Sequence, residues 1–237
     1  MVGVQVAERP MAGGWIDGLP GTESLVPAET LTDKAYRALE EEIVTLRIPP
    51  GTVVSEAMLS RRLGIGRTPV REALQRLVRE WLVVILPRRG IVVSEIDPVR
   101  QLRVLEVRRE IERFLSRCSA QRATAAQRAR FAAVAAGMDE AAARADDLAF
   151  MRLDREFNLL VLESAGNEFA AAAMALMNGL SRRFWYLHYK QAADLPLAAR
   201  LHAAIARAIE ASDADGAGRA SDALVDYIQT FARATIG

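Results

Sequence analysis

Apolar residues recur three or four positions apart along most of the chain from residue 31 onward, which is the spacing of a buried helix face. The first such stretch starts after Thr32, a residue type that caps helices, and ends at Pro49-Pro50-Gly51. A second, short stretch follows Ser55 and stops at Gly64. A third opens at Thr68-Pro69, where proline costs no helical hydrogen bond. These stretches predict three consecutive helices.

Two short runs rich in β-branched residues follow the third helix. They are residues 83–86 and 91–93, and the four residues Pro87-Arg88-Arg89-Gly90 separate them. Such a pair of runs around a turn predicts a β-hairpin. Three helices followed by a hairpin predict a winged helix-turn-helix domain over residues 31–95.

The remainder, residues 97–235, is predicted to contain helices only. Asp97 can cap the first helix, and Pro98 suits its first position. Six stretches with helical spacing follow one another through short connections, and they end near residues 122, 144, 164, 191, 211 and 234. The predicted fold is therefore mainly α, with an N-terminal winged helix-turn-helix and a C-terminal antiparallel bundle of six or seven helices.

Composition narrows the class of protein. The chain has 237 residues, of which 51% are hydrophobic and 26% charged, as in ordinary globular proteins. Residues 1–30 have no periodicity and many glycines and prolines, so we expect a disordered leader. The single cysteine excludes an internal disulfide and sites built on several thiolates. No apolar run reaches the ~20 residues of a membrane span, which predicts a cytoplasmic protein without a membrane partner.

Positive charge is concentrated in one segment. Residues 61–90 contain eight arginines and two glutamates, a net charge of +6, whereas the whole chain carries +1. On the third helix, Arg67, Arg71 and Gln75 lie off the apolar stripe near the N-terminal end, where a recognition helix meets base edges. Arginines on a helix usually form only a solvated face, but this density beside a basic hairpin favours double-stranded DNA as the partner.

The segment Gly64–Leu74, GIGRTPVREAL, resembles the signature of the GntR family of bacterial transcription regulators. Gly66 stands where the family usually has serine, and Trp81 stands where it has the glycine before the wing. The resemblance implies a DNA-binding dimer with the recognition helix in the major groove and the wing tip in the minor groove. The implied DNA-binding residues are Arg67, Thr68, Arg71, Gln75, Arg88, Arg89 and Gly90.

Residues 97–230 are similar to the effector domain of the FadR branch of that family, the FCD domain. The matching pieces are Glu106-Val107-Arg108, Asp154-Arg155-Glu156-Phe157, Ala165-Gly166-Asn167 and Leu201-His202. In many such domains one aspartate and three histidines hold a metal. Here Asp154 and His202 are retained as residual candidates, while Asn158 and Tyr227 replace two histidines. Asparagine is a poor zinc ligand, so we expect no metal and no cofactor.

The same positions predict an effector site. Polar residues that project into a bundle usually line a ligand pocket. We expect Arg108, Asp154, Asn158, His202 and Tyr227 to converge there, with Arg108 binding a carboxylate or phosphate of a small organic acid. The alternatives are an ion pair between Arg108 and Glu112, a buried histidine, a surface acid and a core tyrosine.

The functional hypothesis is a homodimeric repressor that reads a near-palindromic operator and responds to a small acidic metabolite. One alternative is an acyl-CoA-responsive regulator whose pocket is lined by Met174, Met177 and Phe184. Others are a bundle that only dimerises, or a metal-dependent enzyme using Asp154 and His202, for which nucleophile and base are missing. Aromatic residues of the segment 185–189 wall the pocket or form a dimer seam.

Overall fold

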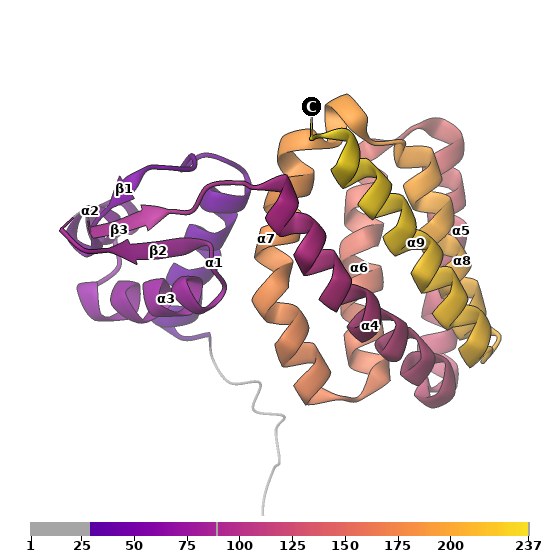
Figure 1. The fold of residues 1–237 in the computed structure, drawn as a ribbon. Helices are drawn as coiled ribbons and strands as arrows, with labels where there is room; N and C mark the ends of the chain where they lie inside the picture. Colours follow the sequence, from indigo (N-terminus) through magenta and orange to yellow (C-terminus); the bar gives the residue numbers. More distant parts are fainter. Residues whose placement is uncertain (1–28, 89, 237) are drawn as a thin grey trace, which may run out of the picture. The chain divides into compact units, whose positions relative to one another are not determined.

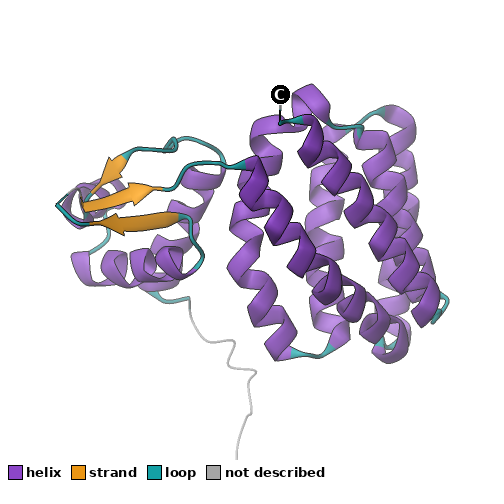
Figure 2. Cartoon of the chain, viewed as in Figure 1, coloured by secondary structure: helices purple, strands orange, loops and turns teal. Residues whose placement is uncertain are grey.

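The computed structural model describes residues 29–88 and 90–236, and within these it contains nine helices and three strands (Figures 1 and 2). The leader predicted for residues 1–30 lies outside the described residues, except for its last two. No helix in the described part of the chain is long and apolar enough to cross a membrane. The order of elements confirms the predicted fold, a winged helix-turn-helix followed by six helices.

The winged helix-turn-helix contains three helices and a small antiparallel sheet. Its elements are α1 (Leu31–Val44), β1 (Val53–Val54), α2 (Glu56–Leu63), α3 (Arg67–Arg79), β2 (Val83–Leu86) and β3 (Gly90–Val93). The strand order is β1-β3-β2, so the predicted hairpin is present and gains β1 as a third strand. A single apolar core joins the helices to the sheet, with Leu39, Leu59 and Leu77 almost fully buried.

Local capping explains most of the helix boundaries. The Ser55 hydroxyl accepts from the Met58 N–H at the start of α2, and Gly64 ends that helix with φ 65°. Two predicted starts were wrong. Thr32 lies inside α1, where its hydroxyl donates to Glu72 at 2.6 Å, and α3 begins at Arg67, two residues before Pro69. Proline is still tolerated there because the first turn of a helix has no intrahelical acceptors for its N–H groups.

The turn before the wing keeps its shape without glycine. Trp81 has φ 56°, the left-handed conformation that glycine adopts freely and that costs other residues ~1 kcal/mol. Its ring is 44% exposed, and the Arg100 guanidinium carbon lies 5.9 Å from the ring centroid. Trp81 therefore takes a backbone conformation that glycine adopts freely, and it directs much of its surface to solvent.

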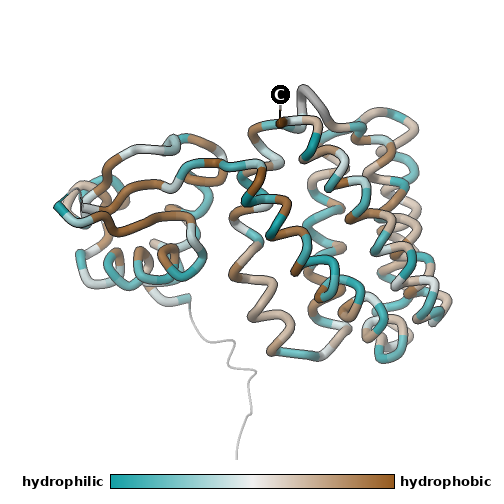
Figure 3. The backbone as a smooth tube through the Cα atoms, viewed as in Figure 1, coloured by the Kyte–Doolittle hydropathy of each residue, from teal (hydrophilic) through white to brown (hydrophobic). Residues whose placement is uncertain are grey.

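The helical bundle contains α4 (Pro98–Arg122), α5 (Ala125–Arg144), α6 (Asp147–Ala165), α7 (Glu168–Ala192), α8 (Leu195–Glu210) and α9 (Ala214–Ala234). A polar side chain caps the N-terminus of each of these helices by accepting from a backbone N–H. The last helix starts earlier than predicted because Asp213 caps it and places Gly216 inside the first turn. Hydrophobic residues recur at intervals along the bundle helices and fill β2 and β3 (Figure 3).

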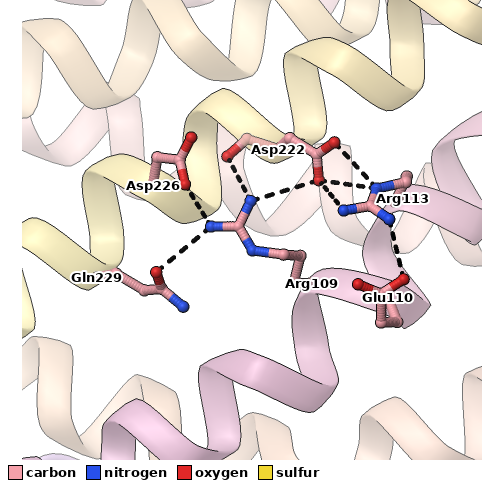
Figure 4. Close-up of polar contacts among 6 residues, drawn as sticks. All are labelled: Arg109, Glu110, Arg113, Asp222, Asp226 and Gln229. Atoms are coloured by element: carbon pink, nitrogen blue, oxygen red, sulfur yellow. Dashed lines mark hydrogen bonds and ion pairs between the residues drawn. The ribbon is translucent and has the colours of Figure 1, made fainter.

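Helices α4 and α9 lie side by side and are joined by a ladder of ion pairs (Figures 1 and 4). Asp222 of α9 accepts from Arg113 at 2.8 and 2.9 Å and also pairs with Arg109 at 3.5 Å. Arg109 reaches Asp226 one turn further along α9. Gly218 lets the helices approach, since a Cβ there would lie 3.2 Å from the Arg117 Cγ. The ladder fixes the register of α4 against α9.

We expect Asp222→Ala to lower the thermal midpoint by a few degrees, because it removes an acceptor from two half-buried arginines. Asp226→Ala is the matched control on the same helix, since Asp226 is 68% exposed and pairs with Arg109 alone. Differential scanning calorimetry measures both variants. Equal midpoints for the two variants would contradict the role assigned to Asp222.

Candidate functional site

Helix α3 separates an apolar stripe from a polar face. Val70, Ala73, Leu74 and Leu77 are buried in the core of the winged helix-turn-helix. The predicted contact residues Arg67, Thr68, Arg71 and Gln75 are all exposed. Burial of the stripe thus leaves the predicted polar residues directed to solvent.

Arg71 forms a two-pronged ion pair that the sequence analysis missed. Its Nε and one terminal nitrogen each donate to a different oxygen of Glu56 on α2, both at 2.8 Å. The bond from Arg71, followed by its charge, lowers the pKa of Glu56. The pair holds the guanidinium in one orientation while 61% of the Arg71 side chain remains exposed. Glu56 also lies in the first turn of α2, where a negative charge is favoured by the helix dipole.

Other arginines in the basic segment have structural partners. The Arg76 guanidinium carbon lies 3.6 Å from the centroid of the Tyr36 ring, and its Nε is 3.3 Å from Glu80. The Tyr36 hydroxyl donates to both Glu80 oxygens, and burial with this carboxylate raises the pKa of Tyr36. Arg76 therefore belongs to a half-buried network of ion-pair and cation–π contacts.

The remaining arginines are available to a ligand. Among the described residues, the arginines at 61, 67, 79 and 88 form no ion pair and are exposed. Arg88, with φ 65°, lies in the turn between β2 and β3, and Gly90, with φ 84°, is the first residue of β3. Arg89 lies outside the described residues. The recognition helix and the wing turn thus present cations that are not neutralised within the described chain.

In the bundle, two of the predicted polar residues contact each other. The His202 Nε2 lies 3.0 Å from an Asp154 oxygen, and its Nδ1 lies 2.8 Å from the Ala198 carbonyl. Both ring nitrogens face acceptors, so the protonated imidazole satisfies both contacts. Burial opposes that charge, but the hydrogen bond and charge of Asp154 outweigh it, and the pKa of His202 is raised. The Phe150 and Phe157 rings pack edge-on against the imidazole.

The other three residues do not close around this pair as predicted. Asn158 donates to Asp154 at 3.0 Å but is exposed, and the Asp154 side chain is 38% exposed. Arg108 forms an ion pair with Glu112, one turn along α4. Tyr227 donates to the Asp194 carbonyl at 3.0 Å and accepts from its N–H. The structure therefore brings Asp154, Asn158 and His202 together, with part of the group at the surface, while Glu112 takes the Arg108 guanidinium and Asp194 takes the Tyr227 hydroxyl.

The metal and acyl alternatives concern two further sets of residues. No group of three or more metal-ligating acids, histidines or cysteines occurs within the described part of the chain. Met174, Met177 and Phe184, the predicted acyl lining, are buried in the core. Trp185 packs on Phe231, with ring centroids 5.0 Å apart, so it is a core residue.

A second feature missed by sequence reasoning is the buried Arg183 of α7. Its side chain donates to the Ser94 carbonyl and hydroxyl, both at 2.9 Å, and to the Glu95 carbonyl at 3.3 Å. Its neighbour Arg182 is instead exposed and pairs with Glu40 at 2.6 Å. Adjacent arginines give no signal of this difference in sequence, because only the helix phase decides which one faces inward.

We expect the unfolding free energy to decrease as pH rises through the raised pKa of His202, because its protonated form is stabilised in the folded state. That contribution is fully present below the ordinary value of 6.5. Burial lowers the pKa of His188, the other histidine, so its contribution to the pH dependence of unfolding has the opposite sign. The substitution His188→Gln removes that contribution before the measurement.

Urea unfolding between pH 5.5 and 8.5 tests this, with Asp154→Asn compared in the same background. Asn keeps an acceptor but loses the charge, so the pH slope should flatten. An unchanged slope in Asp154→Asn would show that Asp154 does not set the protonation of His202.

Comparison with known proteins gives two family matches that together cover both domains. Residues 31–93 match the bacterial regulatory proteins of the gntR family, and residues 103–227 match the FCD domain. The HTH-type transcriptional repressor RspR of Escherichia coli is 28% identical over 205 residues, covering 83% of this chain and 86% of that protein. An HTH-type regulator from an unstable DNA locus of Streptomyces ambofaciens is 43% identical over 65 residues, 27% of this chain and 28% of that protein.

Among solved structures, the E. coli protein McbR/YncC superposes with a TM-score of 0.72 at 18% identity, over 88% of this chain and 99% of that chain. This likeness independently supports the arrangement of a winged helix-turn-helix followed by a helical bundle. The FCD match alone spans more than half of the chain, and the gntR match covers the domain with the exposed arginines. The chain belongs to the gntR family of bacterial regulatory proteins and carries an FCD domain.

Proposed function

We propose that the protein is a homodimeric repressor that binds a near-palindromic operator in double-stranded DNA. Each copy places α3 in a major groove and the β2–β3 turn beside it, and two copies read half-sites one helical turn apart. The observation that supports this proposal best is the exposed polar face of α3, with Arg67, Arg71 and Gln75 directed to solvent. The repressor role rests on the similarity to RspR.

The ion pair between Arg71 and Glu56 suggests different roles for the paired and the unpaired arginines in DNA binding. Arg71 is held by Glu56 and reads a guanine edge in a fixed orientation, which lowers the entropy lost on binding. Arg67 and Arg88 have no ion pair in the described part of the chain, so they approach phosphate or base edges without breaking a contact. Thr68 and Gln75 extend the same exposed face.

The dimer is proposed to form through the exposed faces of α4 and α7. Exposed apolar residues recur at intervals that keep them on one side of each helix: Val99, Val107 and Phe114 on α4, and Phe169, Leu176 and Leu187 on α7. The two helices are neighbours in the bundle. We propose that a second copy buries these apolar faces in a symmetric dimer.

A small organic acid is proposed to lower operator affinity. The coupling requires a different affinity for the two dimer geometries, typically ~1–3 kcal/mol. Arg108 is already neutralised by Glu112, so it can bind a carboxylate of the acid only by giving up that ion pair. Tyr227 contributes only if the Asp194 contact opens. We also propose that Asp154 and His202 bind no metal tightly, because each satisfies the other.

We expect the double variant Arg67→Ala/Arg71→Ala to lose operator-specific binding, by about tenfold or more for each arginine that contacts a base pair. Fluorescence anisotropy measures it, using duplexes selected by the full-length protein from a random-sequence library. Arg219→Ala is the matched control, because Arg219 is 73% exposed in the bundle and lies 3.9 Å from its nearest acid. Equal affinity for the selected duplex in wild type and the double variant would overturn the proposal.

We expect Phe114→Glu to convert the dimer into a monomer, because a charge placed in the apolar seam cannot be buried without a partner. Light scattering coupled to size-exclusion chromatography gives the mass, and circular dichroism confirms that the helices persist. Leu148→Glu is the control, since Leu148 is 76% exposed on α6, outside the seam. A dimer that survives Phe114→Glu would place the interface elsewhere.

A further inference from the structure

A small cavity lies where the segment after β3 meets the first turn of α4 and the middle of α7. Its lining includes Glu95, Asp97, Arg100 and Arg183, with Phe184 among the apolar residues. Its volume is about 20 Å³. A water molecule needs about 10–15 Å³ measured in the same way, so the cavity admits one compact atom or the end of one carboxylate.

The donors at this cavity outnumber the acceptors that satisfy them. The Arg183 side chain is only 1% exposed, and its Nε finds no acceptor within the part of the chain that the structure describes. Its terminal nitrogens are used by Ser94 and Glu95. Arg100 also lines the cavity and forms no ion pair with a described residue, and its guanidinium carbon lies 5.9 Å from the centroid of the Trp81 ring. An unpaired buried N–H is costly, so this donor calls for a partner.

Two positive charges face this small space with little compensation. Burial and then the charge of Arg100 lower the pKa of Arg183 to about 10, which still leaves it charged at neutral pH. Asp97 caps α4 by accepting from the Val99 N–H. The charge of Glu95 favours the protonated form of Arg183, but it is a smaller effect than burial and the charge of Arg100. Neither forms an ion pair with Arg183 or Arg100 in the described chain.

We infer that this cavity binds one compact monovalent anion, a halide or the carboxylate of a small acid, between Arg183 Nε and the Arg100 guanidinium. The guanidinium groups supply charge-assisted donors, and the N-terminus of α4 adds a favourable dipole. The small volume favours a compact anion over phosphate, sulfate and larger metabolites.

Thermal unfolding of the full-length protein at constant ionic strength tests the inference. Sodium chloride, formate or acetate is compared with sodium methanesulfonate, whose anion is too bulky for the cavity. We expect a higher, saturating midpoint with chloride or a carboxylate than with methanesulfonate. Competition between formate and chloride shows which anion the cavity prefers, and either preference supports a compact anion.

The variant Arg100→Gln removes one charge and leaves the buried Arg183 in place. We expect it to weaken the anion's effect on the midpoint by about tenfold or more in concentration. Arg103→Gln is the matched control, since Arg103 is exposed on the same helix and does not line the cavity. Equal midpoints in all salts, or an unchanged response in Arg100→Gln, would mean that the cavity holds water and would overturn the inference.

This experiment contains no DNA, so its outcome is independent of the proposed operator binding. A protein that binds the anion and fails to bind DNA would leave the inference standing and refute the proposed function. A protein that binds DNA and shows no anion preference would do the reverse.

Discussion

The opposing demands on α3 determine the arrangement of the winged helix-turn-helix. One side of the helix must be apolar enough to bind the domain together, while the other must keep cations in water. Val70, Ala73, Leu74 and Leu77 meet the first demand with almost complete burial. Because these residues occupy the core side of α3, the opposite side, with Arg67, Arg71 and Gln75, is exposed to solvent. The same packing therefore creates both the stability of the domain and its charged surface.

The arginines of the basic segment then divide into two kinds by the partners they find. Arg76 is used internally, stacked on Tyr36 and paired with Glu80, and it contributes to the fold. Arg71 is paired with Glu56 but remains largely exposed, so it is oriented and accessible together. A net charge read from sequence counts both kinds alike. The positive charge exposed to phosphate is therefore smaller than the net +6 of the segment. Part of it, Arg71, is held in one orientation.

Regular structure was predictable from sequence because its determinants are local. Ser55, Gly64, Asp97 and Gly166 act on their own helix ends, and each behaves as its residue type predicts. One error arose where a long-range contact opposed a local signal, and another where two local signals competed. Thr32 is a good cap, yet its hydroxyl donates to Glu72 forty residues away, and the helix begins at Leu31, two residues before the predicted start. The capping role of Asp213 outweighed the loop composition of residues 212–216.

The ligand-related residues were less predictable, because they depend on which side chains finally meet. Asp154 and His202 were expected to lie together and do, at 3.0 Å, since the family pattern placed them at one site although they belong to different helices. Tyr227 shares no such constraint, and its hydroxyl is taken by the backbone of Asp194. Arg183 had no sequence signal at all, although it is the most deeply buried charge in the described chain, at 1% exposure.

That burial has a consequence for any signal between the two domains. Arg183 belongs to a bundle helix, and its hydrogen bonds end on Ser94 and Glu95, which directly follow the last strand of the winged helix-turn-helix. Next to it, Gly179 leaves no room for a Cβ, which would lie 2.6 Å from a methyl group of the buried Leu82. Packed contacts of this kind cannot slide by small amounts. A change in charge near Arg183 would therefore act directly on Ser94 and Glu95, the segment that connects the two domains.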